Sequence, residues 1–402
     1  MRKKWLCLLL AAVGVCLLSA CSAFESEYVS IHDYAPSVQE PSRQDGKINV
    51  RNYSALKSAL LSMAYSGQTE GSIVFDAAYE GDTTEDMASA CWAVRTQDAL
   101  CAYCVENIAY ELNKIVTIHE ASVYISYSDV TERPEDIVHL AFSAEAEEEI
   151  LDALRGGERK LALLVGRSAF SAEDMAAQVT KAYRENPTVV PREPNVNVNI
   201  FSGNGSQRLY EIHINYRLTQ EELEERLAQL SVFDPFAELD PSEMTEAERA
   251  YTACAYLMEH CTESGESGAN NAYSALITGE ADSEGVAFGY VELCRRLGLD
   301  CRIVYGQHDW QDHCWNIVRV DGNSYHVDVT RCMAGELPFA FLKNDESFWG
   351  LYRWDVASYP KCTAEFDDAS LFPHEEEEEQ EQEQETEEFP EPETAEPEGG
   401  NG

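Results

Sequence analysis

Three residues in the C-terminal half of the chain carry the side chains that acyl transfer requires: Ser283, His313 and Asp328. A serine hydroxyl attacks a carbonyl carbon when a neighbouring base takes its proton, and a histidine oriented by a carboxylate is such a base. Ser283 begins a helical pattern that ends at Gly298. Unpaired backbone N–H groups and the helix dipole favour negative charge at such a terminus. The three side chains can therefore supply a nucleophile, a base and an orienting group.

A predicted β-hairpin would bring the histidine and the aspartate together. The apolar segment His313–Val320 is followed by the turn Asp321-Gly322-Asn323 and then by Ser324–Thr330. Two strands joined by such a turn pair with each other. We therefore expect His313 and Asp328 to lie side by side on neighbouring strands, opposite the start of the helix.

At these residues the sequence resembles the transglutaminase-like superfamily, whose members have a papain-type α+β fold and a Cys-His-Asp triad. The family pattern Gly-x-Ala-x-Cys-x-Gly falls on Gly279–Gly285, and the His-x-Trp-Asn and Tyr-His-Val-Asp patterns fall on His313–Asn316 and Tyr325–Asp328. The resemblance covers about residues 245 to 362. It implies that Ser283 stands at the nucleophile position, that His313 is the base and Asp328 the orienting carboxylate, and that Trp315 and Asn316 are binding residues.

Serine at the cysteine position changes the expected chemistry. A thiol beside a histidine at a helix N-terminus ionises near neutral pH, whereas a hydroxyl must lose its proton as it attacks. Cys314 cannot replace the missing thiol, because adjacent residues of a strand point to opposite faces. Ser283 has a second interpretation as the N-cap of the helix. His326 also has an alternative interpretation, because with His313 and Asp328 it would form a set of possible metal ligands. We nevertheless predict no metal and no cofactor.

Two functions follow from this departure. In the first, the domain has lost its chemistry and is a pseudoenzyme that binds a cell-wall peptide or a secreted protein. In the second, Ser283, His313 and Asp328 form a working triad, and the protein is an acyltransferase or amide hydrolase acting on peptide or glutamine amides. A third interpretation, a spacer without ligand, is less consistent with the intact hairpin motif.

The region before this domain contains a weak internal repeat. Glu85-Asp86-Met87-Ala88 recurs as Glu173-Asp174-Met175-Ala176, and the pattern at Val123–Tyr127 recurs at Ile212–Tyr216. Each copy is predicted to form helix, strand, helix and strand, including a helix over 84–110 and a strand over 114–128 with one buried face. The predicted fold class is α+β, with a duplicated unit over 51–230 (copies at about 51–135 and 140–230) followed by the papain-type domain over 240–365.

The N-terminus predicts export and lipid attachment. Three basic residues precede an apolar run from Trp5 to Leu18, which is typical of a secretory signal. Leu18-Ser19-Ala20-Cys21 resembles a bacterial lipobox, in which the cysteine is acylated and becomes the mature N-terminus. We therefore expect a signal peptide over 1–20, a flexible linker over 21–50, and a lipid on Cys21 that holds the protein at the extracytoplasmic face of a bacterial membrane. An ordinary cleaved signal is the alternative.

Charge narrows the class of partner. The formal net charge is −44, and the segment 374–402 contributes fourteen glutamates with a single aromatic residue, Phe389. Proteins that bind nucleic acid neutralise phosphates with Lys and Arg, so a nucleic-acid partner is excluded. A segment as acidic as 374–402 buries too little apolar surface to fold, and we predict a disordered tail there.

Overall fold

The computed structural model describes residues 43–44, 46–115, 118–265, 268–367 and 371. Contacts divide the chain into two compact units. One contains the described residues up to Glu149 with Lys160–Ala176 and Asn197–His213; the other contains Ile150–Arg159, Ala177–Val196 and the described residues from Ile214 onward. The predicted signal peptide, Cys21 and the predicted disordered tail lie outside the described residues. In the part that is described, no helix is long and apolar enough to cross a membrane.

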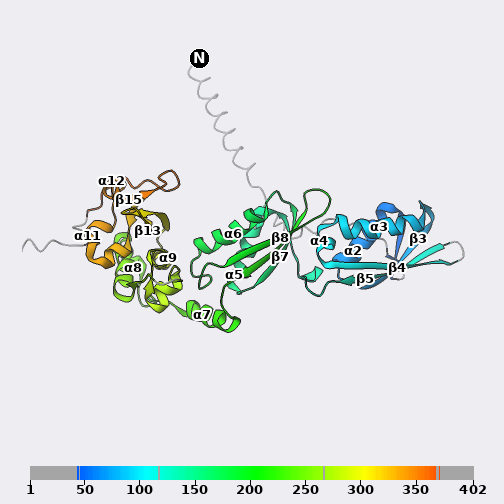
Figure 1. Ribbon diagram of the computed structural model, residues 1–402, viewed down its shortest axis with the longest axis horizontal. Helices are drawn as coiled ribbons and strands as arrows, with labels where there is room; N and C mark the ends of the chain where they lie inside the picture. The colour runs from blue at the N-terminus through cyan, green and yellow to red at the C-terminus, as the bar shows by residue number, and fades with distance from the viewer. Residues whose placement is uncertain (1–42, 45, 116–117, 266–267, 368–370, 372–402) are drawn as a thin grey trace, which may run out of the picture. The chain divides into compact units, whose positions relative to one another are not determined.

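The first unit starts with a five-stranded sheet of order β1-β2-β3-β5-β4 (Figure 1). Its elements are β1 (Arg43–Gln44), β2 (Lys47–Asn52), α2 (Tyr53–Tyr65), β3 (Glu70–Glu80), α3 (Thr83–Gln97), α4 (Ala99–Cys104), β4 (Val105–Ile115) and β5 (Ile118–Tyr127). Ala121, Val123 and Ile125 of β5 are buried while their neighbours are more exposed, so one face of the sheet is buried as predicted. Glu120, which interrupts the apolar alternation, pairs with Lys47 Nζ at 2.7 Å.

A second sheet repeats this topology. Its order is β6-β7-β9-β8, and its elements are β6 (Val138–Phe142), α5 (Ala146–Arg155), β7 (Lys160–Arg167), α6 (Ala172–Glu185), β8 (Asn195–Ser202) and β9 (Arg208–Asn215). The first two strands are parallel and the second pairs antiparallel with the last, as for β2, β3 and β5. The repeated residues Met87 and Met175 are both buried, as are Val123 and Ile212. The two sheets therefore share one topology, as the sequence repeat predicts.

Two details of the predicted region are wrong. The segment predicted as one helix over 84–110 forms two helices and the start of a strand. Helix α3 ends at Gln97, because Asp98 has an extended backbone and its side chain caps α4 through Cys101 N–H at 3.0 Å, and the chain enters β4 at Val105. The linker predicted to reach residue 50 is shorter, because Lys47–Asn52 forms β2. Each copy thus begins with a strand and ends with two strands. Short apolar runs have similar periodicity in helices and strands, which explains the error over 105–110.

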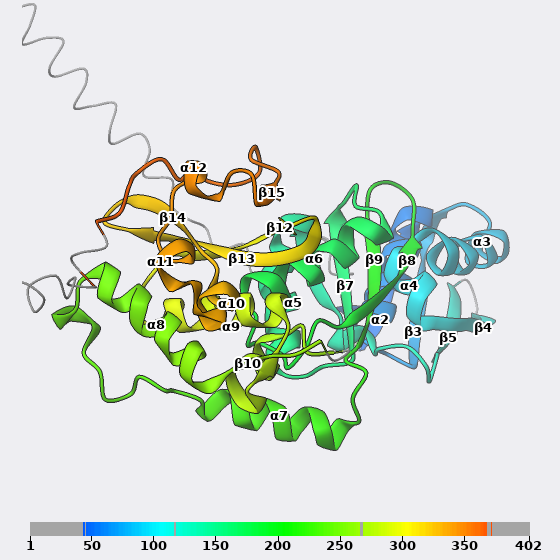
Figure 2. The same ribbon diagram turned by 60° about the vertical axis from the view of Figure 1, so that its left-hand side comes forward.

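The C-terminal part of the second unit is built around an antiparallel sheet of order β14-β13-β12-β15. The elements around it are α7 (Gln220–Val232), α8 (Glu246–His260), β11 (Glu280–Ala281), α9 (Ser283–Arg296), β12 (Cys301–His308), β13 (Gln311–Val320), β14 (Asn323–Val327), α10 (Val329–Arg331), α11 (Leu337–Ala340), α12 (Asp345–Phe348) and β15 (Tyr352–Trp354). Helix α9 packs on β12 and β13 (Figure 2). The predicted helix and hairpin are therefore present, and their contact places the start of α9 near β13.

Candidate functional site

Two glycines set the backbone around Ser283, the first residue of α9. Gly279 has a φ of 74°, in the left-handed region that favours glycine, and a Cβ there would lie 2.8 Å from the carbonyl oxygen of His260. A Cβ on Gly285 would overlap the carbonyl oxygen of Ala269. Both glycines of the motif are thus required by close backbone approach, which fixes where α9 begins.

The residue that caps α9 is Asp282. Its backbone is extended, and its Oδ1 accepts a hydrogen bond from Gly285 N–H at 2.9 Å. The interpretation of Ser283 as the N-cap is wrong, because the cap lies one residue earlier. Ser283 Oγ instead accepts a hydrogen bond from the backbone N–H of Cys314 at 3.3 Å. This bond joins the helix terminus directly to β13.

His313 and Asp328 are brought together as the hairpin predicted. His313 lies in β13, and Asp328 follows β14 and caps the short helix α10 by accepting from Arg331 N–H at 3.1 Å. His313 Nε2 lies 2.7 Å from Asp328 Oδ2. Because a carboxylate only accepts, Nε2 carries the proton of the neutral ring, and Nδ1 keeps the lone pair that a general base needs. Asp328 is fully buried, and 12% of the His313 side chain is exposed.

Tyr352 is a third member of this group that the sequence did not reveal. Its hydroxyl donates to Asp328 Oδ2 at 2.8 Å, on the same oxygen that His313 uses. Burial and the negative charge of Asp328 raise the pKa of Tyr352, so the phenol stays a donor. Tyr352 comes from β15, which is 24 residues beyond Asp328 and pairs with the end of β12. Only the sheet order places it there.

Ser283 stands beside this network without belonging to it. Among the described residues, no hydrogen bond joins Ser283 Oγ to His313, and the partner of Oγ is the N–H of Cys314. Catalytic hydrogen bonds are often long in the absence of substrate, so the chemistry of a triad remains within reach of these side chains. In this structure Asp328 orients His313, while the Ser283 hydroxyl is held separately by the backbone of Cys314.

The segment that carries this site matches one family model. Residues 237–329 match the family model of the transglutaminase-like superfamily. This segment is a transglutaminase-like domain. The predicted α+β fold class is confirmed, since the structure combines helices with several sheets.

Three solved structures resemble the chain at low sequence identity. One is described as a candidate cysteine protease from Cytophaga hutchinsonii, at 12% identity and a TM-score of 0.22 over 34% of this chain and 62% of that one. A TGase matches at 12% identity and a TM-score of 0.19 over 52% and 61%, and a candidate protease from Parabacteroides distasonis at 9% and 0.19 over 64% and 39%. Each match spans less than two thirds of the other chain. The comparison with curated proteins gave no match.

In the transglutaminase-like domain, Trp315 and Asn316 are buried rather than placed to touch a ligand. Trp315 is 1% exposed, and Asn316 is fully buried. Asn316 Nδ2 donates to the carbonyl oxygens of Ala287 at 3.0 Å and Arg302 at 3.4 Å, which ties β13 to α9 and β12. The expectation that these two residues bind a ligand is therefore corrected: in this structure they hold the site together.

His326 belongs to a different hydrogen-bond chain from the one at His313. Trp315 Nε1 donates to His326 Nδ1 at 3.0 Å, and His326 Nε2 lies 2.9 Å from Asp345 Oδ1. The alternative interpretation of His313, His326 and Asp328 as a metal-binding set does not hold, because the two histidines bond to different carboxylates. Indole N–H groups only donate, and burial lowers the pKa of His326, so its single proton sits on Nε2 and points at Asp345.

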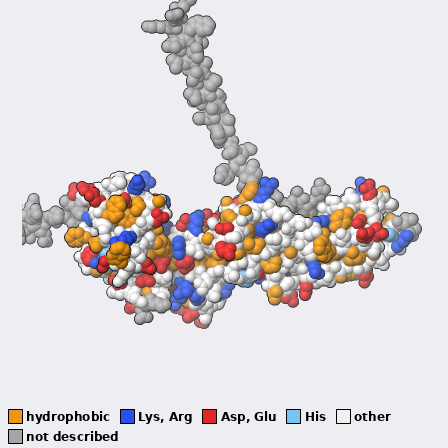
Figure 3. All heavy atoms as spheres, turned by 45° about the horizontal axis from the view of Figure 1, so that its top comes forward, with side chains coloured by type: hydrophobic (Ala, Val, Ile, Leu, Met, Phe, Trp, Pro, Cys, Tyr) orange, Lys and Arg blue, Asp and Glu red, His pale blue; other side chains and the backbone are white. Residues whose placement is uncertain are grey.

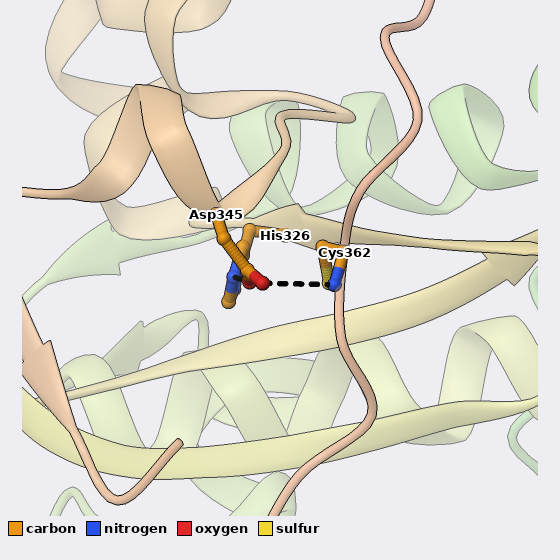
Figure 4. A group of neighbouring side chains, drawn as sticks. All are labelled: His326, Asp345 and Cys362. Carbon is orange, nitrogen blue, oxygen red and sulfur yellow. Dashed lines mark hydrogen bonds and ion pairs between the residues drawn. The ribbon is translucent and has the colours of Figure 1, made fainter.

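A second set of possible metal ligands surrounds Asp345 (Figure 4). One ligand atom each from His326, Asp345 and Cys362 lie within 4.8 Å of one another. Asp345 Oδ2 also accepts from the backbone N–H of Cys362 at 3.3 Å. A metal would have to displace the Nε2 proton or the Trp315 bond, and burial raises the pKa of the Cys362 thiol to about 12, which opposes a thiolate ligand. The group fits a structural hydrogen-bond chain better than a metal site.

Cys314, the thiol next to the base in the sequence, is not a substitute nucleophile for Ser283. Burial, with Glu284 and Asp282 nearby, raises the pKa of the Cys314 thiol to about 12. Burial also raises the pKa of Glu284, which accepts from Asn270 Nδ2 at 3.0 Å. A protonated thiol is a poor nucleophile. Cys314 therefore contributes its backbone N–H to the site and not its sulfur.

A further histidine lies at the exposed side of the pair. The His308 ring centroid is 5.5 Å from that of His313 and 4.6 Å from that of Tyr352. Burial and the neighbouring His313 lower the pKa of His308, so it adds no positive charge beside the base near neutral pH. The end of β12 thus lines the site with a neutral ring.

Proposed function

We propose that this protein is an extracytoplasmic lipoprotein whose transglutaminase-like domain binds a cell-wall peptide or protein without turning it over. The observation that carries this proposal is the state of Ser283. A serine stands where the family has cysteine, and its Oγ accepts from Cys314 N–H instead of donating to His313. In this arrangement the hydroxyl is not paired with the base that would take its proton.

The charge beside Ser283 supports the same proposal. Glu284 follows Ser283 directly, and its carboxyl group is partly buried. When ionised, it places negative charge near the position where an alkoxide or oxyanion would form. His313 and Asp328 are still held in place by their hydrogen bond, so the base and its carboxylate are kept although the family's nucleophile is not.

The anchor is proposed from the sequence around Cys21. Acylation there would hold the domain at the outer face of the membrane, and two acyl chains make such an attachment stable. We expect cells grown with a clickable palmitate analogue to incorporate the label into the full-length protein, and Cys21→Ala to abolish incorporation. Equal labelling of the Cys21→Ala variant would contradict the anchor.

Ligand binding that does not depend on Ser283 is the test of the binding function. We expect the full-length protein to bind the synthetic wall stem peptide Ala-Glu-Lys-Ala in isothermal titration, and Ser283→Ala to keep the dissociation constant within about twofold, because loss of one weak polar contact costs little. A fluorophosphonate probe should leave wild-type Ser283 unlabelled. A Ser283 adduct on the folded protein would contradict the proposal.

The hydrogen-bonded pair of His313 and Asp328 favours a second candidate function, that of a Ser-His-Asp acyltransferase or amide hydrolase. His313, Asp328 and Tyr352 form a complete hydrogen-bond network with Nδ1 free to accept a proton. If this candidate holds, the protein releases ammonia from a glutamine peptide, and Ser283→Ala and His313→Ala each abolish the release. Release that survives Ser283→Ala would exclude the triad as its source.

A further inference from the structure

A hollow of about 240 Å³ opens beside β15. It is lined by Trp349, Gly350, Tyr352, Arg353, Trp354 and Val356. Trp349 is 71% exposed and Val356 is 39% exposed, and the neighbouring Leu351 is 58% exposed. Hydrophobic side chains gather over the region of α12 and β15 in Figure 3, among acidic ones. The hollow thus has mixed walls, in which hydrophobic side chains stand beside the Arg353 guanidinium, and the size of a single small group or residue.

One cation lines this hollow without an anionic partner. The Arg353 guanidinium carbon lies 3.3 Å from the centroid of the Trp310 ring. Its Nη1 is buried and has no hydrogen-bond acceptor, and none of the described carboxylates lies within ion-pair distance of Arg353. A guanidinium stacked on an indole keeps its N–H donors in the plane, where they match a carboxylate. In a chain of net charge −44, an unpaired cation in a hollow is a specific feature.

The hollow shares a wall with the predicted catalytic group. Tyr352 lines the hollow and donates to Asp328 Oδ2 at 2.8 Å. Asp309 N–H, next to Trp310, donates to Leu351 O at 3.0 Å, so the turn that carries Trp310 is fixed against the β15 segment. Arg353 is therefore held by its strand and by Trp310, and a group bound there lies one side chain away from Asp328.

We propose that this hollow recognises the C-terminal carboxylate of a peptide. Arg353 pairs with the carboxylate, and the side chains of Trp349 and Val356 contact the side chain of the last residue. A hollow of this size suits a chain end better than a continuous strand of peptide. The inference rests on the proposed binding function and identifies the part of the ligand that the protein recognises.

Three related peptides test whether the hollow recognises the terminal carboxylate or a side-chain carboxylate. We expect the full-length protein to bind Ala-Glu-Lys-Ala with a free C-terminus about tenfold or more tightly than the C-terminal amide, since charge-assisted bidentate contacts carry that much affinity. Ala-Gln-Lys-Ala with a free C-terminus should bind like the parent peptide. Equal binding of acid and amide overturns the carboxylate site while leaving the binding function in place. Loss of affinity in the Gln peptide overturns the terminal assignment, and no binding of any form overturns both proposals.

Substitution of Arg353 tests the residue. Arg353→Gln should lower the affinity for the acid peptide to that for the amide, and Arg353→Lys should give an intermediate value because it keeps charge but loses the planar fork. Arg302→Gln is the matched control, because this substitution removes the same charge from a side chain on β12 that is 62% exposed. Acid preference that persists in Arg353→Gln, or that falls equally in Arg302→Gln, overturns the assignment. Comparing the two peptides on each variant keeps the test independent of small changes in stability.

Discussion

Replacing Asp328 with alanine is expected to lower the free energy of unfolding of the transglutaminase-like domain by about 3 kcal/mol, since each buried donor left without a partner costs about 1–3 kcal/mol. The fully buried carboxylate accepts from His313 Nε2, from Tyr352 O–H and from the backbone N–H of Arg331. Its removal leaves the Tyr352 hydroxyl and the Arg331 N–H without their acceptor. His313 is partly exposed and can turn to water, so it contributes less to the loss.

Urea unfolding followed by tryptophan fluorescence measures this effect on the domain itself. Four of the six tryptophans lie between residues 310 and 354, so the signal reports mainly on this part of the chain. Tyr352→Phe removes one of the three bonds and should cost about 1 kcal/mol. Asp300→Ala is the surface control, because its side chain is 60% exposed. An Asp328→Ala midpoint equal to that of Asp300→Ala would show that the network contributes nothing to stability.

The sequence was sufficient for the parts of the site that depend on local pattern. A turn at Asp321-Gly322-Asn323 between two apolar segments specifies a hairpin and its register, so the meeting of His313 with Asp328 followed directly. The duplicated unit was also visible, because the repeated residues Met87 and Met175 are core positions of equivalent helices. These features require only neighbours in sequence or a repeated spacing.

The parts that the sequence did not predict depend on pairing between distant segments. Tyr352 reaches Asp328 only because β15 pairs with β12, and no spacing rule gives that order. His326 and Asp328 lie two residues apart, yet His326 bonds to Asp345 because α12 approaches from beyond the hairpin. The cap of α9 was misplaced by one residue, since both Asp282 and Ser283 are good N-cap residues and only the backbone geometry distinguishes them.

Ser283→Cys is expected to create a reactive thiol. A cysteine at a helix N-terminus beside a histidine has a lowered pKa, and its thiolate fraction near pH 7 rises accordingly. We expect iodoacetamide to alkylate this variant at pH 7 about tenfold faster than an ordinary exposed thiol, a gain moderated by the lower nucleophilicity of acidic thiols. Cys314 will not compete, because burial holds its pKa at about 12. Peptide mass spectrometry locates and times the adduct.

His313→Ala in the Ser283→Cys background separates the two sources of activation. If His313 stabilises the thiolate, the alkylation rate falls to that of an ordinary thiol. If the helix terminus and the Cys314 N–H suffice, the rate is unchanged. The second result would mean that residue 283 is separated from His313 in function as well as in the structure. Tyr352→Phe in the same background should lower the rate by a smaller factor, because it leaves Asp328 to orient His313 alone. If the Ser283→Cys variant unfolds normally but is alkylated no faster than an ordinary thiol, the site no longer activates residue 283. The domain would then have lost both the cysteine and the electrostatic environment that lowers the pKa of a thiol at this position, and it would act by binding alone.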